Sequence, residues 1–110
     1  MEFIETLDGS VMVSDADGNI IYLNEKAVTN FQDDGGRELI GKNLNDCHNT
    51  ASNEKINHMI RTHEKNVYTI EKNGKKKLIY QSPWYHDGKF GGLVELSLEI
   101  PFEMPHFVRE

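Results

Sequence analysis

The sequence predicts an α+β fold in which an N-terminal β-hairpin is joined through helices to a meander of three β-strands. Three observations predict this class. Residues 10–23 show a strand–turn–strand pattern, residues 51–66 show the pattern of an amphipathic helix, and three segments after residue 66 alternate with a period of two. The expected order of elements is therefore β-β-α-α-α-β-β-β.

The composition indicates one small acidic domain. The chain has 110 residues and a formal net charge of −6, so we expect no direct contact with nucleic acid, because an acidic chain repels phosphate backbones. The single cysteine, Cys47, permits no internal disulfide and fits a reducing compartment. No apolar run approaches the ~20 residues of a membrane span, and the first residues do not resemble a secretory signal. We therefore expect a cytoplasmic protein without membrane contact.

The N-terminal hairpin is the first element. Residues 1–8 form an expected cap segment, in which apolar residues recur at helical spacing. The strand at residues 10–14 is followed by Asp17-Gly18, a strong turn signal because glycine adopts positive φ at little cost. The returning strand ends at Asn24, which is a good N-cap for a helix that begins at Glu25.

The helical part follows the hairpin. Ala27, Val28 and Phe31 give the first helix a short apolar face, and Glu38-Leu39-Ile40 is expected to form one further turn. The clearest helix of the sequence spans residues 51–66. Its apolar face is expected to carry four residues, which are Ile56, Met59, Ile60 and His63.

Three strands are expected after the long helix. The dipeptides Asn73-Gly74 and Asp87-Gly88, both typical of tight hairpins, join them into a meander. In the last strand, Leu93, Glu95, Ser97 and Glu99 share one face. The opposite face carries Val94, Leu96, Leu98 and Ile100, which is the more apolar set and the expected core face.

Several motifs resemble those of PAS domains. Residues 13–24 resemble the opening of that family, Glu38 to Lys42 reads ELIGK like an element that PAS domains place after the second helix, and residues 90–94 resemble the start of the last strand. The resemblance covers roughly residues 8 to 100. It implies a five-stranded antiparallel sheet with helices packed on one face, with the last strand beside the first and a pocket under the helices. The expected PAS domain is residues 9–100.

Two segments depart from the common PAS pattern. After the ELIGK element the chain carries a Cys47-His48 pair, which resembles a smaller subgroup of the family. At the other end, Pro101 and Pro105 oppose a continuous output helix. The tail at residues 101–110 carries apolar groups that we expect to pack on the sheet or on a second subunit, namely Phe102, Met104, Phe107 and Val108.

The resemblance implies a sensory module for signal transduction, including transcription regulation, rather than an enzyme. We expect a homodimer that binds a small ligand or an unidentified signalling protein and relays this event through dimer or terminal contacts. The expected pocket is lined by residues of the long helix and of the last strand, which are Ile56, Met59, Ile60, His63, Val94 and Leu96. The alternative is that these residues fill the core and leave no cavity.

Two other functions compete with this hypothesis. Some PAS domains hold haem through a histidine near the long helix, and here His63 or His48 could supply the iron ligand. No other cofactor is indicated, and no metal site is expected, since His58 and His63 lie about 140° apart on a helix. A small enzyme that transfers protons could use Glu95 or Glu99 with Tyr80. Alternation, however, is expected to leave both glutamates on the outer face of the sheet.

Overall fold

The structure, a computed structural model, describes residues 1–46 and 50–110. Cys47 and His48 lie outside the described residues, so the prediction of a Cys-His subgroup stays a prediction. The elements, in chain order, are α1 (Glu2–Glu5), β1 (Ser10–Ser14), β2 (Ile20–Leu23), α2 (Glu25–Asn30), the 3₁₀ turns η1 (Gln32–Asp34), η2 (Gly36–Leu39) and η3 (Leu44–Asp46), α3 (Thr50–Thr62), β3 (Asn66–Lys72), β4 (Lys75–His86) and β5 (Lys89–Ile100).

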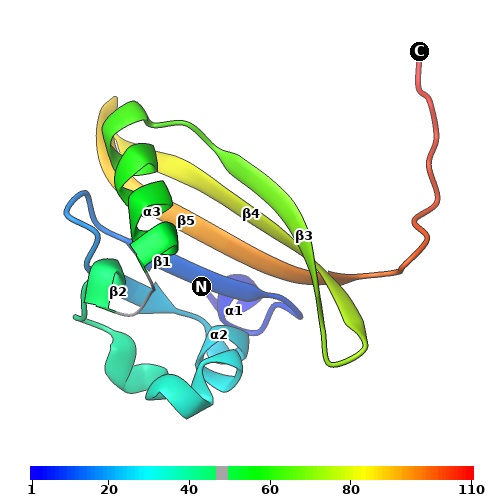
Figure 1. The fold of residues 1–110 in the computed structure, drawn as a ribbon, viewed down its shortest axis with the longest axis horizontal. Helices are drawn as coiled ribbons and strands as arrows, with labels where there is room; N and C mark the ends of the chain where they lie inside the picture. Colours follow the sequence, from blue (N-terminus) through cyan, green and yellow to red (C-terminus); the bar gives the residue numbers. More distant parts are fainter. Residues whose placement is uncertain (47–49) are drawn as a thin grey trace.

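The five strands form one antiparallel sheet in the order β2-β1-β5-β4-β3. The last strand therefore lies beside the first, as predicted. Both predicted hairpin dipeptides form tight turns, in which Asn73, Gly74, Asp87 and Gly88 all have positive φ. In Figure 1, α3 crosses the sheet on the same side as α2 and the 3₁₀ turns. We call this side of the sheet the inner face and the opposite side the outer face.

The core lies between the inner face and these helices. Its buried apolar cluster comprises Met12, Ile20, Leu23, Ala27, Leu39, Leu44, Ile56, Met59 and Leu93. On β5, Glu95 pairs with Met12 of this cluster and Ser97 pairs with Ser10, so Leu93, Glu95 and Ser97 belong to the inner face. The expected core face was Val94, Leu96, Leu98 and Ile100. This expectation is wrong for Leu96, Leu98 and Ile100, whereas Val94 is among the residues that line the cavity between α3 and the sheet. Leu98 instead lies close to Gly9 and Leu7, at the segment that follows α1.

Helix α3 ends at Thr62, four residues earlier than expected. The next residue, His63, has a φ of 59° in the left-handed region, which stops the helix. Its ring stacks on Phe90 of β5 with a centroid separation of 4.0 Å and an interplanar angle of 5°. His63 thus lies beyond the end of the helix rather than on its apolar face.

The turn between β1 and β2 is organised by the carboxylate of Asp15. Its Oδ1 accepts hydrogen bonds from the backbone N–H of Asp17 (3.0 Å) and Asn19 (2.9 Å), and its Oδ2 accepts one from Asn19 Nδ2 (3.2 Å). The ELIGK segment docks on the same hairpin, since Gly41 N–H donates to Ile20 O at 2.7 Å and Ile20 N–H donates to Lys42 O at 2.8 Å. The turn therefore fixes the position of the chain that leads to α3.

Replacing Asp15 with alanine is expected to lower the free energy of unfolding by about 2 kcal/mol, because the turn loses its charged acceptor. Burial raises the pKa of Asp15, but the hydrogen bonds from Asn19 and Asp17 lower it by more. The pKa of Asp15 in the folded protein is therefore below its ordinary value of 3.8. This stabilisation is therefore complete above the unfolded pKa and is lost as the pH falls through the folded pKa. Urea unfolding of wild type and Asp15→Ala at pH 7 and pH 3 should show a difference that shrinks at the lower pH.

Candidate functional site

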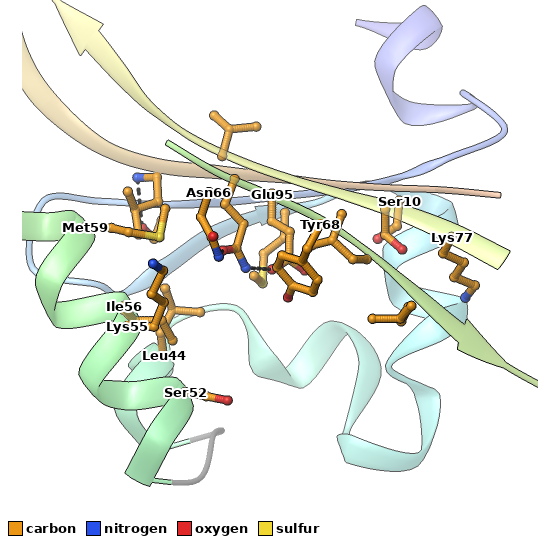
Figure 2. A pocket seen from close by; sticks show the side chains of 18 of the residues that line it. Ser10, Leu44, Ser52, Lys55, Ile56, Met59, Asn66, Tyr68, Lys77 and Glu95 are labelled. Carbon is orange, nitrogen blue, oxygen red and sulfur yellow. Dashed lines mark hydrogen bonds between the residues drawn. The ribbon is translucent and has the colours of Figure 1, made fainter. Parts of the chain in front are cut away.

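A cavity of about 580 Å³ lies between α3 and the inner face of the sheet. Figure 2 shows side chains from α3 and from the sheet pointing into this space from opposite sides. Its apolar wall is formed by Met12, Leu44, Ile56, Met59, Ile79 and Leu93. This volume is within the range of small-molecule sites in proteins. The helices and the sheet therefore leave a ligand-sized space, and the alternative of a fully packed core is not supported.

A chain of hydrogen-bonded side chains crosses the floor of the cavity. Asn66 Nδ2 donates to Gln81 Oε1 at 2.9 Å, and Gln81 Nε2 donates to Glu95 Oε2 at 2.7 Å. The three residues occupy one register row across β3, β4 and β5, so we call them the acceptor row. No described residue hydrogen-bonds to Asn66 Oδ1 or Glu95 Oε1. The row thus presents two acceptor oxygens to the space above it.

Tyr68 stands beside the acceptor row and lines the same cavity. Burial raises the pKa of its phenol, and the negative charge of Glu95 raises it further. The phenol therefore stays protonated at neutral pH and can donate or accept a hydrogen bond. Ser10 and Ser97 lie next to one another in the neighbouring row and add two hydroxyl groups to the lining.

Three lysines also line the cavity. Lys55 extends from α3, whereas Lys72 and Lys77 belong to β3 and β4 close to the hairpin that joins these strands. Among the described residues, none of the three forms an ion pair with a carboxylate. The lining therefore carries three basic groups against the single acidic group of Glu95, although the chain as a whole has a net charge of −6.

The structure brings together only part of the predicted site. Ile56, Met59 and Val94 line the cavity. The other three predicted residues do not line the cavity. Ile60 packs against the core, Leu96 lies on the outer face, and His63 stacks on Phe90 beyond the end of the helix. The sequence reasoning missed the acceptor row, Tyr68 and the lysines. The one signal for the row was the alternation of Glu95 and Ser97 with apolar residues, which was assigned to the opposite face.

The described residues offer no histidine for haem in the cavity. His63 is exposed and lies outside the lining, and one face of its imidazole is covered by Phe90. His58 lies 3.2 Å from Glu64 at the surface. Within residues 1–46 and 50–110, no group of three His, Cys, Asp or Glu side chains is placed to hold a metal ion. His48, the second proposed ligand, lies outside the described residues, so its role as a haem ligand stays a prediction.

The pair proposed for proton transfer does not assemble. Tyr80 pairs with Leu96 and belongs to the outer face, while Glu99 is exposed and lies 3.5 Å from Lys75. The expectation that Glu95 and Glu99 are on the outer face is wrong. The register of Glu95 with Met12 directs it into the cavity, and Glu99 pairs with Lys77 on the same face without lining the cavity. The neighbour of Glu95 in the cavity is Tyr68 rather than Tyr80. Glu95 is thus a polar group of the cavity and is separated from the phenol with which it was expected to act.

The family model described as PAS domain matches residues 7–83, which is more than half of the chain. The chain therefore belongs to the PAS domain family, as its motifs predicted. This is a family of sensory modules, which favours a function other than catalysis. No curated protein matches the sequence significantly.

Solved structures of PAS proteins share the fold. The Aer2 receptor of Vibrio cholerae, described as a dual PAS-heme oxygen sensor, superposes with a TM-score of 0.63 at 16% identity, covering 84% of this chain and 95% of that chain. A sensory box sensor histidine kinase from Vibrio cholerae gives 0.66 at 14% identity, with 92% and 89% covered. The Vibrio cholerae VqmA dimer, a LuxR-type receptor, gives 0.67 at 14% identity, with 92% and 51% covered. At these identities the similarity shows the fold.

None of the helices in the described part of the chain combines the length and the hydropathy that a membrane crossing requires.

Proposed function

We propose that this PAS domain is a sensor whose input is the binding of a small molecule in the cavity under α3. The observation that carries the proposal is the cavity itself, which is about 580 Å³ in volume and has both an apolar wall and a polar floor. A domain that served only as an interaction surface would have no need of an unfilled space with a hydrogen-bonding lining, since native cores are close-packed. A ligand in this cavity would contact β5, which pairs with both β1 and β4, so its binding could affect the packing of the whole sheet.

Strand β5 is the proposed route of the signal. Glu95 and Ser97 line the cavity, and the same strand ends at Ile100, immediately before the tail of residues 101–110. A ligand that contacts Glu95 acts on the strand that pairs with both β1 and β4. Binding therefore biases the packing of the tail and of the outer face without passing through a loop.

The proposed output is a change in protein contacts, first of all in a homodimer. The tail extends away from the sheet (Figure 1). Its apolar side chains Phe107 and Val108 are 69% and 80% exposed, and the carbonyl oxygen of Phe102 accepts a hydrogen bond from Lys76 Nζ at 3.5 Å. The outer face adds Val67, which is 45% exposed, beside Tyr80 and Leu96. A second copy of the chain would cover these groups, and a cytoplasmic signalling protein or transcription regulator would receive the signal.

Native mass spectrometry of freshly purified protein tests the proposal. We expect a noncovalent adduct or, after addition of a compound library, specific binders with one molecule per subunit, and the same spectrum reports the oligomeric state. The variant Ser97→Phe places a ring in the cavity and is expected to abolish binding. Thr69→Phe is the matched control, because it adds the same ring to the outer face of the neighbouring strand pair. Equal binding by both variants would contradict the proposed site.

A further inference from the structure

We propose that the ligand of this cavity is an elongated organic anion with an uncharged hydrogen-bond donor, such as a hydroxyl or an amide N–H, at its far end. The inference rests on the proposed function, since it names the chemical class that the same cavity would take. It is carried by the separation of two kinds of polar group along the inner face, the acceptor row at one end and a pair of lysines at the other.

The register of the strands gives the distance between these ends. Gln81 of the acceptor row and Lys77 are four residues apart on β4, which corresponds to about 13 Å along an extended strand. On β3, Lys72 lies two residues closer to the hairpin than Ile70, which is the register partner of Lys77. Both lysines therefore lie on the same side of the cavity. Between the two ends the lining comprises Tyr68, Ile79 and Ser97. The site is thus longer than a single functional group and has distinct termini.

The lysine end fits an anion. Lys72 and Lys77 line the cavity without an ion pair to a carboxylate among the described residues. Glu99 is the register partner of Lys77 on β5, but its carboxylate lies 3.5 Å from Lys75 Nζ. Two ammonium groups on the same side of the cavity favour an anion between them. A carboxylate placed there would receive charge-assisted hydrogen bonds from both. Lys75 and Lys76 extend this basic cluster around the hairpin between β3 and β4, in a chain whose net charge is −6.

The acceptor end fits an uncharged donor. Asn66 Oδ1 and Glu95 Oε1 are able to accept hydrogen bonds from a ligand. A ligand N–H or O–H placed between these two oxygens would donate to them. Lys55 of α3 also lines the cavity and is a cation able to offset the charge of Glu95. An uncharged donor can bind both oxygens without adding a further cation to a lining that already carries three lysines. The apolar side chains between the two ends would contact a hydrocarbon or aromatic body.

A matched set of three probes tests the assignment on the whole chain by chemical-shift titration. The probes are 8-hydroxyoctanoic acid, octanoic acid, which lacks the donor, and 1-octanol, which lacks the anion. We expect the hydroxy acid to bind most tightly and 1-octanol least tightly. Lys77→Gln should weaken the binding of both acids by about tenfold, because it removes a hydrogen bond to a charged group. The affinity for 1-octanol should not change. Glu95→Gln should reduce the difference in affinity between 8-hydroxyoctanoic acid and octanoic acid.

Lys89→Gln is the control, because Lys89 is exposed at the start of β5 and does not line the cavity. If all three probes bind equally to wild type and to every variant, the cavity binds small molecules but the assigned class is wrong. If none of the probes binds, and no library compound binds in a manner that Ser97→Phe abolishes, the proposed function fails together with the inference. Octanoic acid binding that is insensitive to both Lys77→Gln and Lys72→Gln would also overturn the assignment of the anion.

Discussion

Replacing Gly92 with alanine is expected to destabilise the domain by about 3 to 5 kcal/mol, which is a large part of the stability of a small protein. A Cβ at this position would lie 2.0 Å from the carbonyl oxygen of Ser14 and 2.6 Å from the carbonyl carbon of Asp15. These are backbone atoms at the end of β1, the strand next to β5, and of the residue that follows it, so neither side-chain rotation nor a small shift relieves the overlap. The φ of Gly92 is +145°, which adds backbone strain for any other residue.

The consequences extend beyond one contact because several elements meet at Ser14. Its Oγ accepts a hydrogen bond from Leu93 N–H at 3.2 Å, and its carbonyl oxygen accepts one from Trp84 Nε1 at 2.9 Å. Displacing β5 from β1 would break both and would also move Leu93 out of the core. Urea unfolding monitored by tryptophan fluorescence measures the loss directly, since Trp84 is the only tryptophan of the chain.

Gly88→Ala is the matched control for Gly92→Ala. Gly88 also has positive φ, at +77°, but no heavy atom lies within 4 Å of its ideal Cβ position. This variant should therefore cost only about 1 kcal/mol of backbone strain. Similar losses for the two variants would show that the close approach of β1 and β5 contributes nothing beyond the unusual backbone conformation.

The strands and their connections could be predicted because local signals determined them. The Asn-Gly and Asp-Gly dipeptides adopt positive φ at both positions and join β3, β4 and β5 into a meander. The pairing of β5 with β1 could be predicted only through the family resemblance, since nothing local brings residues 10–14 to residues 94–97. The early end of α3 coincides with the left-handed backbone of His63 and the stacking of its ring on Phe90, a tertiary contact that no pattern within the helix indicates.

The candidate site was predicted only in part for a physical reason. Alternation assigns the more apolar side of a strand to the core, but on β5 the inner face lines a cavity that carries polar groups. Glu95 and Ser97 therefore point inward, while Leu96 and Leu98 lie on the outer face. Of the four residues expected on the apolar face of α3, Ile56 and Met59 contribute to both the core and the cavity wall, whereas Ile60 and His63 do not line the cavity.

Asn24 was predicted as the N-cap of α2, and the structure confirms that its Oδ1 accepts a hydrogen bond from Ala27 N–H at 2.9 Å. The same oxygen accepts a second bond from Val11 N–H at 3.0 Å. Its Nδ2 donates to the carbonyl oxygens of Ile4 and Gly9, both at 2.9 Å. One fully buried amide therefore connects α1, β1 and α2.

Replacing Asn24 with alanine is expected to lower the free energy of unfolding by about 3 to 5 kcal/mol. The cap alone contributes about 1 kcal/mol, and the buried Val11 N–H and Gly9 carbonyl would each be left without their side-chain partner at a cost of about 1 to 3 kcal/mol. Asn24→Asp retains the acceptor but loses both donors. It would place a carboxylate oxygen against the carbonyls of Ile4 and Gly9, so it should be nearly as destabilising at neutral pH.

Thr29→Ala serves as the comparison within α2. Thr29 is exposed and its hydroxyl donates only to Glu25 O, so its removal should change stability by no more than about 0.5 kcal/mol. If Asn24→Asp were as stable as wild type in urea unfolding while Asn24→Ala lost only about 1 kcal/mol, the residue would act as a helix cap alone. The larger loss expected here follows from the two donors, because they hold the N-terminal segment against β1. That segment adjoins Leu98 of β5, so Asn24 also determines how the proposed signalling strand is covered on its outer face.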